Sequence, residues 1–208
     1  MQTLAGDIRL LDVQDQRRMP WKNGGGVTRE LAKFPAGTGL DGNPFLWRIS
    51  IADVEGDGPF SVFPGYDRTI MLIDGSGMEL ESQDRQTARL ATPYQPWQFS
   101  GDVATDCRLL DGPVRDFNVM SARDRVTHHC DVIRGSASEA IWQPDSTALF
   151  CLCLHGTVIV KLRDHAEWPL AAEQSLWFPL TTAMASTRIL LAPNSSRSVA
   201  VLVTLKHL

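Results

Sequence analysis

The segment TIMLIDGSGMEL, residues 69–80, reads as a strand, a tight glycine turn and a second strand. The segment FCLCLHGTVIV, residues 150–160, has the same form, with a glycine at the equivalent turn. Farther along the chain, LATPYQPWQF at 90–99 loosely matches LAAEQSLWF at 170–178 when one gap is allowed. A similar unit thus occurs twice, roughly eighty residues apart, and repetition at a fixed offset indicates a repeated structural unit.

The rest of the chain favours an all-β fold. The sequence has 16 Gly and 12 Pro, gathered in clusters such as DGNP, EGDGP and DGSG, with short strand-like runs between them. Many short strands with frequent turn signals are typical of a sandwich or barrel. A β unit of this size that closes its own edges is a small barrel or jelly roll, so two copies predict a double barrel.

We expect two domains, residues 1–131 and 132–208, and the expectation allows strands to be exchanged between them. The segment VIRGSASEAIWQPDST, residues 132–147, is rich in Ser, Gly and Ala and is the expected passage from one barrel to the other.

Composition and charge exclude some classes of protein. The chain has 208 residues and a formal charge of -4, whereas a protein that wraps duplex nucleic acid needs a basic face. The longest strongly apolar run, ALFCLCL at 148–154, is far shorter than the ~20 residues of a membrane-spanning helix. The N-terminal segment has no apolar signal core, so we expect no nucleic-acid partner, no membrane association and a cytoplasmic location.

None of the four cysteines belongs to a CxxC pair. Since a chain of this length does not need disulfides to fold, we expect small buried hydrophobic residues, with a metal or redox role as the alternative.

Specific motifs in the first two thirds of the chain carry a family resemblance. They are PWKNGGGVTREL (20–31), WRISIADVEGDGPFSVFPGYDR (47–68), MLIDGSGMEL (71–80) and FSGD…CRLLDGPVRDFNVM (99–120). Together they resemble the HutD/Ves family of bacterial proteins. The resemblance implies a bicupin fold, two small jelly-roll barrels of the cupin (RmlC-like) type, and an accessory or regulatory association with histidine utilisation. The second half of the chain resembles the family only in its general cupin character.

Many cupins hold a metal ion through two closely spaced histidines, a glutamate and a third histidine. Where the first unit would carry the histidine pair, this sequence reads GYDRT at 65–69. His128 and His129 are neighbours, and neighbouring strand residues face opposite sides. His155 falls in a turn, and His165 in a charged loop. We therefore expect no metal site and no cofactor.

Alternation along WRISIADV, residues 47–54, gives a first set of candidate ligand-binding residues. The tryptophan and the isoleucines share one face, so Arg48 and Ser50 share the other and are expected to line the barrel interior. An inward arginine needs a partner, because an unpaired buried charge is costly. That partner is either a protein carboxylate, Glu30 or Asp67, or the carboxylate of a ligand, and the two alternatives are compatible.

Further candidates lie in the other family motifs. Arg68 follows FPGYD and supplies a second guanidinium, Lys22 and Asn23 add donors from the opening loop, and Asn118 donates and accepts. Two arginines and a lysine suit a dicarboxylate or an acylated amino acid. The resemblance, rather than the spacing, implies that these residues converge. The expected ligand-binding set is Trp21, Lys22, Asn23, Glu30, Arg48, Ser50, Asp67, Arg68 and Asn118.

The glycines of KNGGGVT lack the Lys-Ser/Thr ending of a phosphate loop, and the chain has no GxSxG nucleophile motif. Glycine lets the backbone approach another surface closely, so we expect this loop to form the rim of a pocket. On that interpretation, Gly25→Val abolishes the response to ligand and leaves the fold intact.

Three functions remain open. The first is a metal-free bicupin that binds a small carboxylate of histidine breakdown, such as urocanate or a formyl- or formimino-glutamate, without being an enzyme. The second is a metal-independent hydrolase or isomerase acting on such an acid, with Glu30 as the general base. The third is an interaction protein that forms a homodimer through its second barrel.

Overall fold

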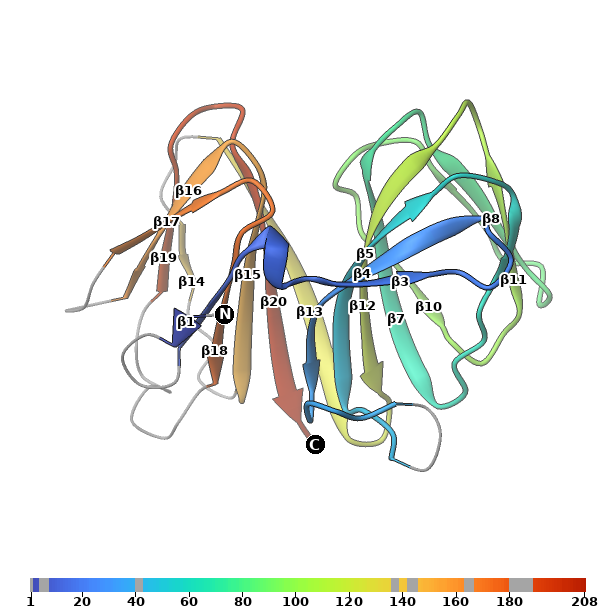
Figure 1. Ribbon diagram of the computed structural model, residues 1–208, viewed down its shortest axis with the longest axis horizontal. Coiled ribbons are helices and arrows are strands. Elements are labelled where there is room, and N and C mark those ends of the chain that lie inside the picture. Colours follow the sequence, from blue (N-terminus) through green and yellow to red (C-terminus); the bar gives the residue numbers. More distant parts are fainter. Residues whose placement is uncertain are drawn as a thin grey trace. The chain divides into compact units, whose positions relative to one another are not determined.

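The protein was analysed as a computed structural model that describes residues 2–3, 8–39, 43–135, 139–141, 146–162, 167–179 and 189–208. The described residues form β-strands connected by turns, with one short 3-10 helix, η2 (Val13–Asp15). Figure 1 shows these strands gathered into twisted sheets. The expected all-β fold class is confirmed.

The chain divides into two compact units. The N-terminal unit is Gln16–Thr127 together with Leu208, and the C-terminal unit is Met1–Asp15 together with His128–His207. This division differs from the expected one at 131/132, chiefly because β2 (Arg9–Leu11) pairs with β18 (Ser175–Pro179) of the C-terminal unit. The segment Met1–Asp15 therefore groups with the C-terminal unit, although it precedes the N-terminal unit in the sequence.

Two antiparallel sheets build the N-terminal unit. One has the order β10 (Trp97–Ser100), β7 (Tyr66–Asp74), β12 (Val114–Ala122), β5 (Trp47–Val54), β4 (Gly26–Phe34) and β3 (Arg17–Pro20). The other has the order β6 (Gly58–Phe60), β11 (Thr105–Leu109), β8 (Met78–Ser82) and β9 (Thr87–Leu90).

The C-terminal unit is built in the same way. Its larger sheet has the order β1 (Gln2–Thr3), β2, β18, β15 (Ala148–His155), β20 (Val199–His207) and β13 (Val126–Arg134). Its smaller sheet has the order β14 (Glu139–Ile141), β19 (Ile189–Pro193), β16 (Thr157–Leu162) and β17 (Glu167–Ala171).

Strand order repeats between the units. The order β10-β7-β12-β5 corresponds to β18-β15-β20-β13, and β6-β11-β8-β9 corresponds to β14-β19-β16-β17. Strands β5 to β12 therefore match strands β13 to β20 one by one, in agreement with the repeat seen in the sequence. Each unit is a jelly roll in which a larger sheet faces a smaller one.

The glycine turn that first indicated the repeat has a role other than closing a hairpin. β7 and β8 belong to different sheets, as do β15 and β16, so the turn carries the chain from one sheet to the other. Gly75 has φ +94° and Gly156 has φ +73°, a region that glycine adopts without strain. The expected hairpin is wrong because the two strands find their partners elsewhere in the jelly roll.

The core of the N-terminal unit lies between its two sheets. Ala52, Val54, Ile70 and Leu72 from the larger sheet pack against Met78, Leu80, Leu90 and Cys107 from the smaller one. Inward residues on β5 and β7 therefore have even numbers, and this parity places the side chains of the site described below.

The four cysteines are buried, as expected, and none forms a disulfide bond. Burial raises the pKa of the Cys107 thiol to about 12 and that of Cys153 to about 11.

Across the described parts of the chain, no helix has the length and apolar character needed to cross a bilayer.

Candidate functional site

A cavity of about 550 Å³ lies within the N-terminal unit. Its walls come from the end of β3, the turn that follows it and the start of β4, from β5, β7 and β12, and from β6 and the segment after it. The lining residues are Met19, Pro20, Trp21, Lys22, Asn23, Thr28, Arg48, Ser50, Ala52, Pro59, Phe60, Ser61, Phe63, Arg68, Asp116, Asn118 and Met120.

Strand register brings the polar lining residues together. β12 lies between β5 and β7, with Asn118 opposite Ser50 and with Met120 opposite both Arg48 and Arg68. Because side chains alternate along a strand, residues two apart on β5 and on β12 share the inward face. Arg48 and Ser50 therefore face the interior, as the alternation in the sequence predicts.

Arg68 lies at the floor of the cavity and is only 5 % exposed. Its Nη2 donates to Asn118 Oδ1 at 3.1 Å and its Nη1 donates to the carbonyl of Ser61 at 3.3 Å, whereas Nε has no hydrogen-bond partner. Burial lowers its pKa to about 10, opposed by the charge of Asp116. The guanidinium carbon lies 4.7, 5.3 and 5.6 Å from the ring centroids of Phe99, Phe63 and Phe60, distances at which a cation is attracted to a ring.

Asp116 is a site residue that the sequence reasoning missed. It is 0 % exposed; its Oδ1 accepts a hydrogen bond from Asn118 Nδ2 at 2.7 Å, and its Oδ2 has no partner. Burial raises the pKa of this carboxyl to about 7, against the hydrogen bond from Asn118 and the charge of Arg68. The available signal was DFNVM, because alternation places Asp116 and Asn118 on one face of a strand.

Glu30 is the internal partner of Arg48. Arg48 Nε lies 3.2 Å from Glu30 Oε2, and Lys33 Nζ lies 3.4 Å from Glu30 Oε1. Burial lowers the pKa of Arg48, while the charge of Glu30 opposes that shift. Glu30 does not line the cavity within the described chain. The structure places Glu30 behind Arg48 as its protein partner, one of the alternatives that the sequence left open, and its place among the ligand-binding residues stays a prediction.

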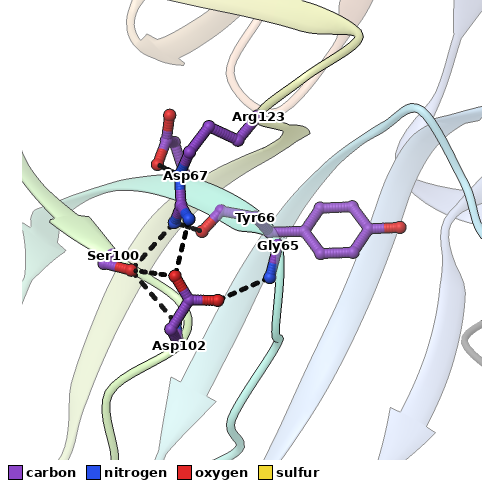
Figure 2. A network of polar contacts seen from close by, with 6 residues as sticks. All are labelled: Gly65, Tyr66, Asp67, Ser100, Asp102 and Arg123. Carbon is purple, nitrogen blue, oxygen red and sulfur yellow. Dashed lines mark hydrogen bonds and ion pairs between the residues drawn. The ribbon is translucent and has the colours of Figure 1, made fainter.

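Asp67 is likewise outside the cavity lining found among the described residues. It is next to the inward Arg68 on β7, so its side chain takes the opposite face of the strand. There Asp67 Oδ1 accepts from Arg123 Nε at 2.7 Å, and Arg123 Nη1 lies 2.6 Å from Asp102 Oδ2 (Figure 2). Strand parity therefore places Asp67 away from the cavity, and its role in ligand binding stays a prediction.

The network in Figure 2 fixes the start of β7. Asp102 Oδ1 accepts the backbone N–H of Gly65 at 2.5 Å, and Oδ2 accepts from Ser100 Oγ at 2.8 Å. Arg123 Nη2 donates to the carbonyl of Tyr66 at 3.2 Å. These bonds, first that of Gly65 and then those of Ser100 and Arg123, lower the pKa of Asp102 to about 2. The network holds the turn at residues 64–65, directly before the strand that carries Arg68.

The rim of the cavity is an ordered turn between β3 and β4. Trp21 N donates to the carbonyl of Gly26 at 2.9 Å, Gly24 N donates to the carbonyl of Trp21 at 3.1 Å, and Trp21 Nε1 donates to Thr28 Oγ1 at 2.8 Å. Lys22 and Asn23 lie at the tip of this turn and line the cavity.

The close backbone approach of this turn occurs at Gly26 rather than at Gly25. A Cβ atom at Gly26 would lie 2.4 Å from the Asp53 carbonyl oxygen and 3.3 Å from the Trp21 ring. At Gly25 the nearest neighbour of such an atom is the Asn23 side chain at 3.5 Å, an ordinary contact.

The cavity does not fit the metal centre found in many cupins. It presents two arginines and a lysine, and its carboxyl group, that of Asp116, is fully buried. Nowhere in the described ranges do three or more His, Cys, Asp or Glu side chains gather in a way that would hold a metal ion. His129 Nε2 lies near Asp131 Oδ1 at 3.1 Å, and His165 lies outside the described residues.

Comparison with known families gives one strong match. The family model named HutD matches residues 13–193. An uncharacterised 21.2 kDa protein from the hutC 3′ region of Pseudomonas putida is 48 % identical over 118 residues, which is 57 % of this chain and 60 % of that protein. Protein Ves of Citrobacter koseri is 42 % identical over 115 residues, 53 % of this chain and 58 % of that protein. The matched segment thus spans about three fifths of each curated relative.

Solved structures match over nearly the whole chain. A conserved protein of unknown function from Pseudomonas aeruginosa PAO1 has a TM-score of 0.84 and 33 % identity, covering 97 % of this chain and 100 % of that one. HutD from Pseudomonas fluorescens SBW25, solved in a formate condition, has a TM-score of 0.79 and 32 % identity, covering 97 % and 99 %. Lactobacillus farciminis oxalate decarboxylase, a cupin, shares the fold alone, at 10 % identity and a TM-score of 0.64 over 96 % of this chain and 86 % of that one.

Proposed function

The chain belongs to the HutD family, which is associated with histidine utilisation, and we propose that its N-terminal unit binds a small carboxylic acid of histidine breakdown. The candidate acids are urocanate, N-formyl-glutamate and N-formimino-glutamate. The role we propose is accessory or regulatory, and it requires no metal ion.

One observation carries this proposal: two arginines, Arg48 and Arg68, line the same cavity of about 550 Å³. Cavities of roughly 300–1,000 Å³ hold small-molecule ligands, so an acid with one or two carboxylates fits. Arginine binds carboxylates through charge-assisted hydrogen bonds that are stronger than neutral ones. Arg68 is already held by Asn118 and Ser61, so its side chain loses little conformational freedom on binding.

The remaining walls suit the rest of such a ligand. Trp21 and Phe60 pack edge to face with centroids 6.4 Å apart, and both line the cavity. They offer apolar surface to a planar ring or to the methylene groups of a glutamate chain. Lys22 and Asn23 at the rim add a cation and an amide, which suit a second carboxylate or an acyl group.

The geometry favours binding over catalysis. Glu30, the expected general base, pairs with both Arg48 and Lys33, and these two cations occupy its carboxylate oxygens. A catalytic function would require turnover of one of the acids, and one-dimensional NMR of protein incubated with each acid detects it. Turnover that Glu30→Gln abolishes, with binding retained, would replace our proposal by the catalytic one.

A thermal-shift screen with the three acids tests the proposal. Binding to the folded state alone stabilises it by about 2.7 kcal/mol when the ligand concentration is a hundred times Kd. We expect at least one acid to raise Tm of the native chain, and to raise it less in Arg48→Gln. An unchanged Tm at millimolar concentrations of all three acids would remove the proposal.

Two accompanying expectations stay predictions. The protein is expected to form a homodimer, which light scattering at several concentrations tests. It is also expected in the cytoplasm, which cell fractionation tests.

A further inference from the structure

The floor of the cavity contains a carboxyl group that is not fully satisfied. Asp116 is 0 % exposed and its Oδ2 has no hydrogen-bond partner. A buried polar atom without a partner costs free energy, and the cost is higher when the group is ionised. Burial therefore favours the protonated form of this carboxyl over the ionised form, because protonation removes the buried charge.

Asn118 bridges Asp116 and Arg68 by hydrogen bonds. The amide nitrogen of Asn118 donates to Asp116 at 2.7 Å, while its oxygen accepts from Arg68 at 3.1 Å. The positive charge of Arg68 therefore stabilises the ionised form of Asp116 through Asn118, without a direct ion pair. An anion bound at Arg68 would offset that positive charge and weaken the stabilisation.

Charged or titratable groups on the neighbouring elements act on Asp116 or on the arginines of the cavity. Arg68 on β7, Asp53 on β5 and Cys107 on β11 interact with Asp116 itself. Arg48 on β5 acts on Arg68 and pairs with Glu30 on β4, and Lys22 lies on the rim. Of these, Arg68 favours the ionised form of Asp116, Asp53 disfavours it, and Glu30 is neutralised by Arg48 and Lys33. The pKa of Asp116 is about 7, so the ionised and protonated forms are both populated near neutral pH. One added negative charge nearby would shift this equilibrium toward the protonated form.

We propose that the cavity binds its anionic ligand together with one proton, and that Asp116 takes up this proton. The inference rests on the proposed function, since it concerns the same site. A ligand carboxylate near Arg48 and Arg68 adds a negative charge beside Asp116. It also offsets the positive charge of Arg68, which otherwise stabilises the ionised form of Asp116. Both effects raise the affinity of Asp116 for a proton, which comes from solvent and forms an O–H bond on the carboxyl.

The sign of the pH dependence follows from linkage. Ligand binds best to the protonated form, so affinity is full below the pKa of the free protein and falls as pH rises through it. If one proton is linked and Asp116 stays protonated in the complex, Kd increases about tenfold from pH 6 to pH 8. At pH 7 the complex takes up about half a proton for each ligand bound.

Calorimetry of the native chain with N-formyl-L-glutamate is the first test. Both carboxylates of this probe stay ionised between pH 6 and pH 8, so the probe contributes no proton of its own. Titrations at pH 7 in phosphate and in Tris, which differ in ionisation enthalpy, give the number of protons taken up. We expect about half a proton and the tenfold change in Kd. Urocanate is titrated in the same way between about pH 7.5 and 9, where an imidazole ring is neutral.

The variant Asp116→Asn tests the assignment of the proton, with Glu81→Gln on the exposed part of β8 as the matched control. Asp116→Asn should bind with the same affinity at pH 6 and pH 8, and about tenfold more tightly than the native chain at pH 8. Glu81→Gln should keep the native pH dependence. If Asp116→Asn does not fold, the two-buffer measurement on the native chain decides alone.

The outcomes separate this inference from the proposed function. Binding without proton uptake removes the inference and leaves the proposed function standing. An affinity that increases with pH also removes it, since the ionised carboxyl would then contact the ligand directly. If none of the three candidate acids binds, the proposed function and the inference fall together.

Discussion

Arg48 on β5 and Glu30 on β4 form an ion pair, with Nε and Oε2 3.2 Å apart. Arg48 lines the cavity while Glu30 lies behind it, next to Lys33. Glu30 therefore compensates the charge of Arg48 when no ligand is bound, and the ion pair fixes the position of the arginine side chain before a ligand binds. Pre-organisation of this kind lowers the entropy cost of binding.

The first prediction concerns Arg48. Arg48→Gln removes one charge-assisted contact of about 1.5–3 kcal/mol, so we expect the Kd of the bound acid to increase about 10- to 100-fold. Arg125→Gln, at an exposed position in the turn after β12, is the matched control and should leave Kd unchanged. Calorimetry measures both variants. An unchanged Kd in Arg48→Gln would show that the acid binds elsewhere.

The second prediction concerns the rim. Gly26→Ala places a methyl group 2.4 Å from the Asp53 carbonyl oxygen, and the backbone must move to relieve this contact. We expect a loss of about 1–3 kcal/mol in the free energy of unfolding, measured by urea denaturation. Gly25→Ala, one residue earlier, should cost much less, and equal losses in the two variants would contradict the structure of this turn.

The third prediction concerns acid stability. The pKa of Asp102 is lowered from 3.8 to about 2, so this carboxylate stabilises the fold above its ordinary pKa and loses that effect as pH falls toward 2. Asp102→Asn should therefore lower Tm at pH 6, and the difference from the native chain should shrink between about pH 4 and pH 2. Thermal melts followed by circular dichroism across that range give the result. A constant difference would mean that the carboxylate charge is not what stabilises the turn.

The fourth prediction concerns the cysteines. All four are buried and outside disulfide bonds, and burial raises the pKa values of Cys107, Cys151 and Cys153, so little reactive thiolate is present at pH 8. We expect the native chain to react slowly with a disulfide reagent such as DTNB, and four thiols to react quickly once urea unfolds it. Fast reaction of a thiol before unfolding would show that one of these positions opens to solvent.

Local patterns in the sequence predicted much of the fold. The repeated strand–glycine–strand segment indicated two similar β units, and the strand orders agree with it. The pairing of β2 with β18 was not predictable, because it joins residues far apart in sequence and leaves no periodic signal. The same limit applies to the two glycine turns, whose strands pair with other strands of the jelly roll.

For the site, alternation predicted the inward direction of Arg48 and Ser50 on a single strand. It also contained the signal for Asp116, which shares a face with Asn118. The parity of neighbouring strand residues also separates Asp67 from Arg68, so Asp67 lies outside the cavity lining. Which strands lie side by side, and so which inward residues meet, depends on the order β7-β12-β5, and spacing along the chain does not encode that order.

The most direct measurement of the central claim is a crystal structure of the protein with the acid that gives the largest thermal shift. Our account predicts density for the acid in the cavity of the N-terminal unit, with a carboxylate within hydrogen-bonding distance of Arg48 or Arg68. Density for the acid only outside this cavity, at a concentration well above its Kd, would contradict the account.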